Sequence, residues 1–358
     1  MACSYLDIKD YVRKSISSGA FKPNEKLPPD KGIATQFSTS RLTVHRALRE
    51  LAAEGLVQRS PRRGTTVTDP KKSIVGTVAF MLPYFADGRS GELYSSVAED
   101  LLKKGLGLVP YSCHASTEHE MQLARYLLMN PPQGVIISPV DYKESAETIR
   151  LFQKAGIPIV VEGKYELDEL EVSYVSMNNL QGGRLMAEHL LGLGHKRFAV
   201  ISASPVLNAI ERRRAFCDTA RQAGYEIPRN CIFNVLHLSE IFYVVEELMG
   251  RKERPTAIFG ANDFVAAEIM VALRDQGFRI PQDCAVVGLG DDVLAKALIS
   301  PLTTAAGQFQ KQGHLIASVL LNSTQGRFSD VRKIELDFQL VIRESCGQQL
   351  KIANNKNQ

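Results

Sequence analysis

The chain has no tryptophan and no run of about 18 apolar residues, the length that a helix needs to cross a bilayer. Its first seven residues contain neither a basic region nor an apolar stretch, so we expect no secretory signal. The six cysteines are scattered, with no CxxC pair and no metal-ligand spacing. These absences exclude a disulfide scaffold and predict a cytoplasmic protein with reduced thiols and no membrane partner.

Sequence motifs of the common enzyme classes are also missing. The chain contains no GxGxxG, GxxxxGK[ST], GxSxG or HExxH pattern. We therefore expect no enzyme, no catalytic residue and no cofactor. Cys113, His114 and His119 lie close together in the sequence, but two or three soft ligands on one loop rarely form a metal site, so we expect no metal.

The charge is distributed unevenly along the 358 residues. The net charge is +4, yet residues 1–72 contain 14 Lys or Arg and 7 Asp or Glu, so the remainder is slightly acidic. A chain of this length exceeds what one hydrophobic core usually organises. The asymmetry predicts a separate basic module that binds a polyanion.

Three helical patterns and a hairpin pattern fill the first seventy residues. The first helix starts with a capping box at Ser4 and ends at Gly19, and a short second helix begins at Pro29. A third helix is expected from about Ser40 to Glu54, followed by two β-type runs, 56–59 and 65–68, around a basic tip. This order predicts a winged helix-turn-helix.

The third helix of such a module fits the major groove of B-DNA, which is about 12 Å wide. Arg41 is expected to read guanine, while Thr43 and His45 reach base edges or phosphate. Helix termini hold backbone phosphates, and the basic tip of the hairpin lies over the minor groove. The predicted DNA-binding residues are Lys31, Ser40, Arg41, Thr43, His45, Arg46, Arg62 and Arg63, although for Arg46 the alternative is a solvated or paired side chain that reads no base.

Residues 1–69 closely resemble the GntR family of bacterial regulators. The matching residues are Gly19, Leu27-Pro28-Pro29-Asp30-Lys31, Phe37, Ser40-Arg41-Leu42-Thr43-Val44, Glu54-Gly55-Leu56-Val57 and Gly64-Thr65. The resemblance implies a DNA-binding domain over the whole stretch. The sequence departs from the family pattern at Pro29-Asp30, His45 and Arg62, so the operator sequence does not follow from the resemblance.

After a polar linker at 70–73, apolar runs alternate with amphipathic helical patterns. Strand patterns occupy 75–82, 108–112, 134–138 and 157–161, and a second series occupies 173–176, 197–202, 256–260 and 284–289. Alternating strands and helices predict parallel sheets covered by helices, and the split near 163–173 predicts two lobes. Residues 347–358 form a polar tail.

Residues 74–346 resemble the effector domain of the LacI/GalR family, itself similar to periplasmic sugar-binding proteins. The resemblance rests on Gly182-Gly183, Leu193-Gly194-His195-Lys196-Arg197, Arg212, Asn262-Asp263-Phe264-Val265-Ala266, Ile280-Pro281-Gln282-Asp283, Asp291 and Pro301-Leu302-Thr303-Thr304. Together with the GntR-like segment, it implies a hybrid regulator of the arabinose-repressor type. The implied fold is a winged helix-turn-helix (α+β) followed by a two-lobed α/β domain with parallel sheets.

The resemblance also implies an effector site between the lobes. Arg212 and Asn262 match positions that bond ligand hydroxyls, and Asp291 lies beside a carboxylate position that Gly290 occupies here. Without tryptophan, stacking on a sugar falls to tyrosine or phenylalanine, although core packing is the alternative for each. The expected effector-binding residues are Tyr84, Phe85, Arg212, Asn262, Phe264 and Asp291.

We therefore expect a homodimeric repressor of the nucleoid that binds operator DNA under the control of a carbohydrate-like effector. A ligand-dependent activator and a non-sugar effector remain alternatives. Arg213 and Arg214 are expected to face solvent, and an acidic or phosphorylated sugar stays open if either turns inward. A solute receptor for a transporter would need a signal peptide and would have no use for the basic module.

Overall fold

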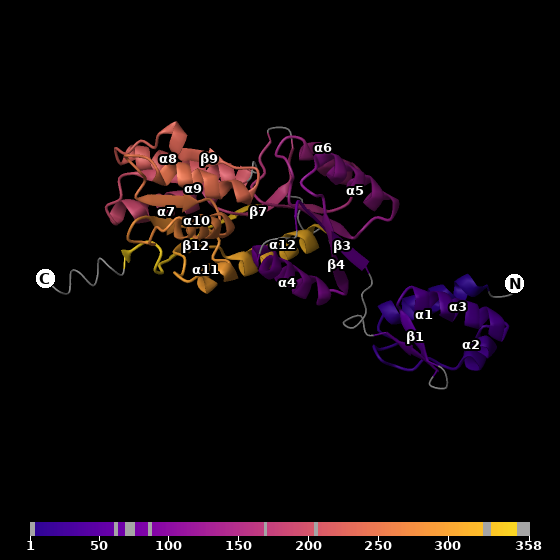
Figure 1. The fold of residues 1–358 in the computed structure, drawn as a ribbon. Helices are drawn as coiled ribbons and strands as arrows, with labels where there is room; N and C mark the ends of the chain where they lie inside the picture. The colour runs from indigo at the N-terminus through magenta and orange to yellow at the C-terminus, as the bar shows by residue number, and fades with distance from the viewer. Residues whose placement is uncertain are drawn as a thin grey trace. The chain divides into compact units, whose positions relative to one another are not determined.

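The computed structural model describes residues 4–60, 64–68, 76–84, 88–167, 170–203, 207–324 and 331–348 (Figure 1). The chain packs as two compact units, and residues 98–109 group with the N-terminal unit. Below, the head is residues 4–68 and the body is residues 76–348, and each is described by itself. Among the described residues no helix has the length and apolarity that crossing a membrane requires.

The head contains the predicted helices and hairpin. Its elements are α1 (Tyr5–Ser17), α2 (Asp30–Gln36), α3 (Arg41–Ala53), β1 (Val57–Ser60) and β2 (Gly64–Val67). The capping box forms as expected, because the Ser4 hydroxyl accepts from the Asp7 N–H and the Asp7 carboxylate accepts from the Ser4 N–H. β1 and β2 pair antiparallel, with Val57 opposite Val67. The winged helix-turn-helix is confirmed.

One apolar cluster holds the head together. The stripe predicted for α3 is completely buried: Val44, Ala47, Leu48 and Leu51 are each 0% exposed. Ile8 and Val12 of α1, Ile33 of α2 and Val57 and Val67 of the hairpin complete this cluster. Burial of one face fixes the opposite face of α3 toward solvent, which is the orientation that a DNA-reading helix needs.

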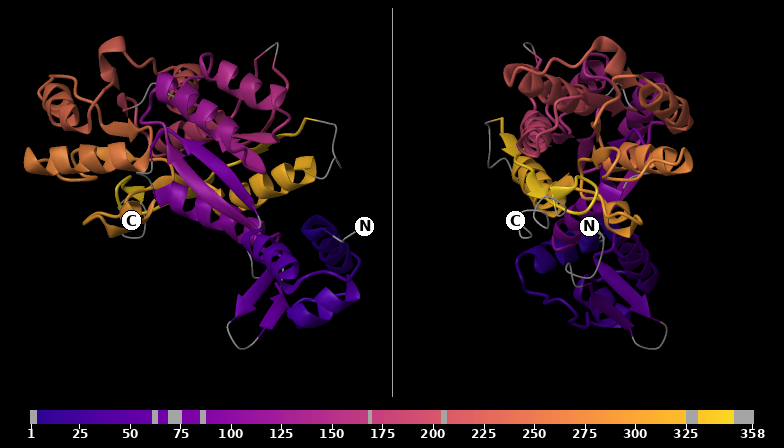
Figure 2. Two further views of the ribbon diagram at one scale, coloured as in Figure 1. Left: turned by 90° about the vertical axis from the view of Figure 1, so that its right-hand side faces the viewer. Right: turned by 60° about the vertical axis from the view of Figure 1, so that its left-hand side comes forward.

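The first lobe of the body contains a six-stranded sheet in the order β13-β7-β6-β5-β3-β4. Its strands are β3 (Gly76–Leu82), β4 (Leu106–Ser112), β5 (Gly134–Ile137), β6 (Ile159–Glu162), β7 (Ser173–Met177) and β13 (Lys333–Leu336). The pairs β5–β6, β6–β7 and β7–β13 are parallel. Helices α5 (Thr117–Met129) and α6 (Ser145–Lys154) cover one face of the sheet (Figure 1). Helices α4 (Gly88–Leu102) and α12 (Phe309–Thr324) lie on the other face, as the left view of Figure 2 also shows.

The second lobe contains a four-stranded parallel sheet in the order β11-β10-β8-β9. These strands are β8 (Phe198–Ser202), β9 (Ile232–Asn234), β10 (Ala257–Gly260) and β11 (Ala285–Val287). Its helices are α7 (Asn179–Gly192), α8 (Leu207–Gln222), α9 (Ile241–Met249), α10 (Asp263–Asp275) and α11 (Val293–Ala297). β12 (Thr304–Ala306) and β14 (Gln339–Val341) form a separate antiparallel pair. The predicted two-lobed α/β fold with parallel sheets is confirmed.

The predicted split of the strands between the lobes was wrong in one respect. The strand expected at 173–176 was assigned to the second series, but β7 lies in the first sheet, between β6 and β13. The strands β9, β12, β13 and β14 and the helices α11 and α12 were not predicted. Within the described residues the chain passes between the lobes three times: after β7, between β12 and α12, and between β13 and β14.

Candidate nucleic-acid interface and ligand site

The start of α3 presents most of the predicted DNA-binding residues. Ser40 caps the helix: its hydroxyl accepts from the Thr43 N–H at 3.1 Å and lies 2.8 Å from the Thr43 hydroxyl. Arg41 is exposed in the first turn, and Lys31 is exposed on α2. The cap therefore orders the backbone from which Arg41 projects. Arg62 and Arg63 lie outside the described residues.

His45 belongs to a polar group that joins α2, α3 and β1. The Arg59 guanidinium donates to the Asp30 carboxylate at 2.7 Å and to the His45 carbonyl at 3.3 Å, and it contacts His45 Nδ1 at 3.1 Å. Nδ1 of His45 also lies 3.7 Å from the Asp30 carboxylate. Asp30 on α2 and Arg59 on β1 thus hold the His45 ring in place. Sequence reasoning missed Arg59, which carries no special spacing.

Arg46 is engaged inside the head. Its guanidinium carbon lies 4.0 Å from the centre of the Tyr5 ring, and Nε lies 3.4 Å from a Glu50 oxygen. Glu50 also accepts from Lys9 at 2.7 Å, and the Lys9 contact is the main cause that lowers the pKa of Glu50. These contacts join α3 to α1, so Arg46 supports the position of the helix as well as adding positive charge to its outer face.

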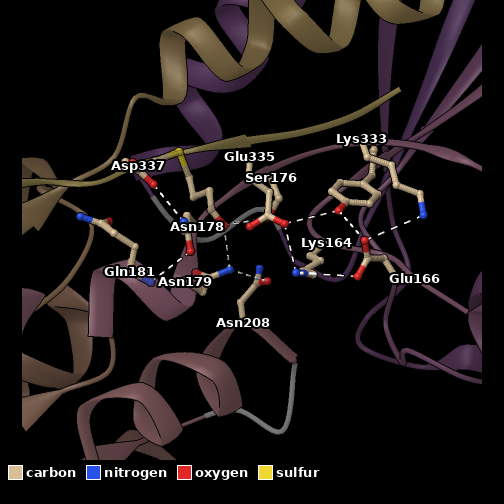
Figure 3. Close-up of polar contacts among 12 residues, drawn as sticks. Lys164, Glu166, Ser176, Asn178, Asn179, Gln181, Asn208, Lys333, Glu335 and Asp337 are labelled. Atoms are coloured by element: carbon tan, nitrogen blue, oxygen red, sulfur yellow. Dashed lines mark hydrogen bonds and ion pairs between the residues drawn. The ribbon is translucent and has the colours of Figure 1, made fainter. Parts of the chain in front are cut away.

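Arg212 is the most buried of the predicted effector residues that the structure describes. It is 4% exposed, its Nε donates to the Asn179 carboxamide oxygen at 2.7 Å, and Nη1 donates to the Ala261 carbonyl at 3.1 Å. The Asn179 amide nitrogen in turn donates to the Met177 carbonyl and to Asn208 (Figure 3). Asn179 and Asn208 were not predicted. Asn179 begins α7 just after β7, and Asn208 lies in the first turn of α8, the helix that follows β8. Such helix starts after strands are where parallel α/β sheets bind ligands, and this was the sequence feature that could have identified both residues.

Asn262 and Asp291 have defined roles in the second lobe. The Asn262 carboxamide oxygen caps α10 by accepting from the Val265 N–H at 2.9 Å, which leaves its amide group to donate elsewhere. Asp291 has a φ of 59° and pairs with Arg343 at 2.5 Å and with Lys296 at 3.7 Å. The negative charge of its carboxylate is therefore already balanced by two cationic side chains within the protein. Arg213, expected to face solvent, is half-buried and lies 3.4 Å from the Ser202 hydroxyl, because α8 turns this side chain toward the end of β8.

The remaining predicted effector residues are less constrained. Tyr84 lies just beyond β3 and is 60% exposed, and Phe264 is half-buried in the first turn of α10. Phe85 lies outside the described residues. Within the described ranges, no group of three or more His, Cys, Asp or Glu side chains could hold a metal ion.

The first lobe adds polar groups at the carboxyl ends of its strands that sequence reasoning missed. The Ser138 hydroxyl, after β5, donates to Glu162 at the end of β6 at 2.6 Å, and Gln312 of α12 donates to the same carboxylate at 3.2 Å. Lys164 then pairs with Glu335 of β13 at 3.0 Å (Figure 3). Hydroxyl, carboxylate and amide groups at this edge are suited to a polyol ligand.

Comparison with known proteins agrees with this geometry. Residues 4–67 match the model of the bacterial regulatory proteins of the gntR family, and residues 187–346 match a periplasmic binding protein-like domain. The arabinose metabolism transcriptional repressor of Geobacillus stearothermophilus is 30% identical over 95% of this chain and 97% of its own length. The regulator CelR of Thermobifida fusca is 26% identical over 86% of this chain and 89% of its own.

A solved structure extends the likeness to three dimensions. The transcriptional regulator CelR–cellobiose complex superposes with a TM-score of 0.69 and 25% identity, over 85% of this chain and 90% of that one. The chain belongs to the family of transcriptional regulators that join a GntR-type head to a periplasmic-binding-protein-like domain, and it is a DNA-binding regulator, not an enzyme.

Proposed function

We propose that the chain is a repressor whose affinity for operator DNA is set by a small sugar bound in the body. The observation that carries the proposal is the buried Arg212, held by Asn179 and Ala261 at the strand ends where a ligand binds. Two relatives that align over 95% and 97% of this chain are named arabinose metabolism repressors, which supports repression over activation. A regulator of chromosomal genes works in the cytoplasm, at the nucleoid.

The residues that we propose for each role follow the sequence analysis. Residues 1–69 form the DNA-binding domain, 70–73 the linker, 74–346 the effector domain and 347–358 a tail. Lys31, Ser40, Arg41, Thr43, His45, Arg46, Arg62 and Arg63 act on DNA, and Tyr84, Phe85, Arg212, Asn262 and Phe264 contact the effector. Asp291, which the sequence placed among the effector residues, is paired with Arg343, so we propose that it shapes the loop beside the site. We add Ser138 and Glu162 as partners for sugar hydroxyls.

A sugar can change the affinity for DNA only if it binds the DNA-binding state and the DNA-releasing state of the protein with different affinities. The coupling free energy between two such sites is typically 1–3 kcal/mol. The decisive experiment is a gel-shift titration on DNA from the gene's own promoter region, repeated with a panel of neutral sugars, sugar acids and sugar phosphates. We expect a neutral sugar to release the DNA. Release by a sugar acid or phosphate alone would instead assign Arg213 to an anionic group.

We also propose a homodimer. Val271 of α10, Val293 of α11 and Ile299 just after it are 36%, 76% and 86% exposed, and large apolar side chains exposed on neighbouring elements suit an interface. Two heads are needed to read two half-sites of an operator. Sedimentation equilibrium of the full chain is expected to give twice the mass of 39.6 kDa. A monomer at micromolar concentration contradicts this assignment.

The first prediction concerns the head. Arg41→Ala removes a planar donor pair from the start of α3 and is expected to weaken specific binding about tenfold to a hundredfold per half-site. Binding to unrelated duplex DNA should change little, because it rests on the summed charge of the head. Arg221→Ala, which removes an exposed arginine paired with Asp218 in the body, is the charge-matched control. Unchanged operator affinity in Arg41→Ala would refute the assignment of α3.

The second prediction concerns the effector site. Arg212→Lys keeps the charge but cannot donate to Asn179 and Ala261 in the same fork geometry, so we expect at least a tenfold loss of sugar affinity. Operator affinity without sugar should stay within twofold of the wild-type value. Arg214→Ala, whose side chain is 77% exposed, serves as the control on the same helix. A normal sugar response in Arg212→Lys contradicts the assignment.

A further inference from the structure

One large apolar side chain stands on the DNA-facing side of α3. Leu42, the second residue of the helix, is 80% exposed, whereas the other exposed side chains of this helix face between residues 41 and 49 are arginine or histidine. Leucine on a cationic surface is not explained by attraction to phosphate, because its side chain carries no charge and no hydrogen-bond donor.

The position of Leu42 on the helix excludes a role in the core. The buried stripe of α3 consists of Val44, Ala47, Leu48 and Leu51, and Leu42 is not among the residues packed against that cluster. Residues three and four places along a helix are neighbours on its surface, so Leu42 lies in one row with His45 and Arg46. It therefore shares the surface that the proposed function places in the major groove.

In the major groove, one kind of base group suits contact with an apolar side chain such as that of Leu42. Base edges in the major groove present hydrogen-bond donors and acceptors, and the C5-methyl group of thymine is their apolar feature. The methyl group of 5-methylcytosine has the same chemistry and position. If Leu42 packs on either methyl group, its side chain becomes buried when the protein binds. If a base edge with hydrogen-bonding groups lay opposite Leu42 instead, those groups would lose their water and gain no partner.

We propose that Leu42 is a specificity-determining residue that packs on a pyrimidine C5-methyl group in each half-site of the operator. The inference rests on the proposed function and deepens it, because it assigns a base identity next to the base pairs that Arg41 and His45 contact. Leu42 supplies apolar contact and discrimination, while the arginine and histidine supply hydrogen bonds.

The test removes one methyl group at a time. Footprinting first defines the DNA site that the protein protects. Each thymidine of one half-site is then replaced by deoxyuridine, which lacks only the C5-methyl group. For wild-type protein we expect one position at which affinity falls about fourfold, equivalent to ~0.8 kcal/mol for one buried methyl group. Leu42→Ala should bind the thymine and uracil forms of that site equally. Because Leu42 is exposed, this variant is expected to fold normally.

Controls separate the possible outcomes. Leu236→Ala, which truncates a leucine of the body that is 76% exposed, should keep the wild-type discrimination. If the uracil scan has no effect but 5-methylcytosine at one position raises affinity about fourfold in a Leu42-dependent way, the contact is to methylcytosine. If neither scan changes affinity, or Leu42→Ala still discriminates, the inference is wrong while the DNA-binding function stands. The lack of any protected site overturns the proposed function, and this inference with it.

Discussion

Gly183→Ala is expected to destabilise the effector domain by about 3 kcal/mol and to abolish its response to sugar. A β-carbon at Gly183 would lie 2.1 Å from the Arg212 carbonyl oxygen and 2.9 Å from the Arg212 carbonyl carbon. These are backbone atoms of α8, so they cannot move aside as a flexible side chain would. The two helices must separate, and Arg212 leaves the position in which Asn179 holds it.

The same helix provides a matched control. Gly192 is the last residue of α7, and a β-carbon added there would meet no described atom within 4 Å apart from its chain neighbours and the adjoining backbone of its own helix. Gly192→Ala is expected to leave stability unchanged or to raise it by up to ~1 kcal/mol, since alanine favours helices. Urea unfolding followed by circular dichroism measures both variants. Equal midpoints for Gly183→Ala and Gly192→Ala would show that α7 and α8 are not in close contact.

Asp263→Ala is expected to destabilise the second lobe by about 2–5 kcal/mol at pH 5, because it removes the carboxyl group that hydrogen-bonds to the Thr304 hydroxyl and to the Asp292 N–H. Asp263 is 2% exposed, and its carboxylate accepts from the Thr304 hydroxyl at 2.6 Å and from the Asp292 N–H at 2.7 Å. It thereby joins α10, the loop after β11 and β12. Asp263→Asn is the matched variant, since its amide can accept from Asp292 and donate to Thr304, and its cost should stay near ~1 kcal/mol.

These two contacts also predict a pH dependence. Burial raises the pKa of Asp263 to about 6, although its hydrogen bonds act in the opposite direction. The folded protein therefore holds a proton that the unfolded chain, with a pKa near ~3.9, has lost. This group's contribution to stability is complete below about pH 4 and is lost as the pH rises to 6, a change of about 3 kcal/mol. The stability of wild type relative to Asp263→Asn should fall over this range, and a constant difference contradicts the assignment.

Local chemistry explains why the head was predictable. The capping box at Ser4, the stripe of α3 and the stop at Gly55, whose φ is 73°, all depend on neighbours within a few residues. The body depends on partners far away in the sequence. The short strand β13 pairs with β7 about 160 positions earlier, and no local pattern marks that pairing.

The same distinction applies to the sites. Arg41 could be predicted because its place in the helix determines its exposure, and Arg212 because a resemblance pointed to it. The groups that orient Arg212 and His45 could not be predicted, because Asn179 reaches Arg212 from α7 and Arg59 reaches His45 from β1. The inward turn of Arg213 depends in the same way on how α8 sits against β8.

The late position of β13 has a consequence for synthesis on the ribosome. Until residues 333–336 emerge, β7 is the outermost strand of the first sheet, and its free N–H and C=O groups are open to pairing with another chain. β14, the partner of β12, emerges later still. The nascent body therefore stays incomplete until nearly the whole chain has been translated, and this interval is when chaperones have most to protect.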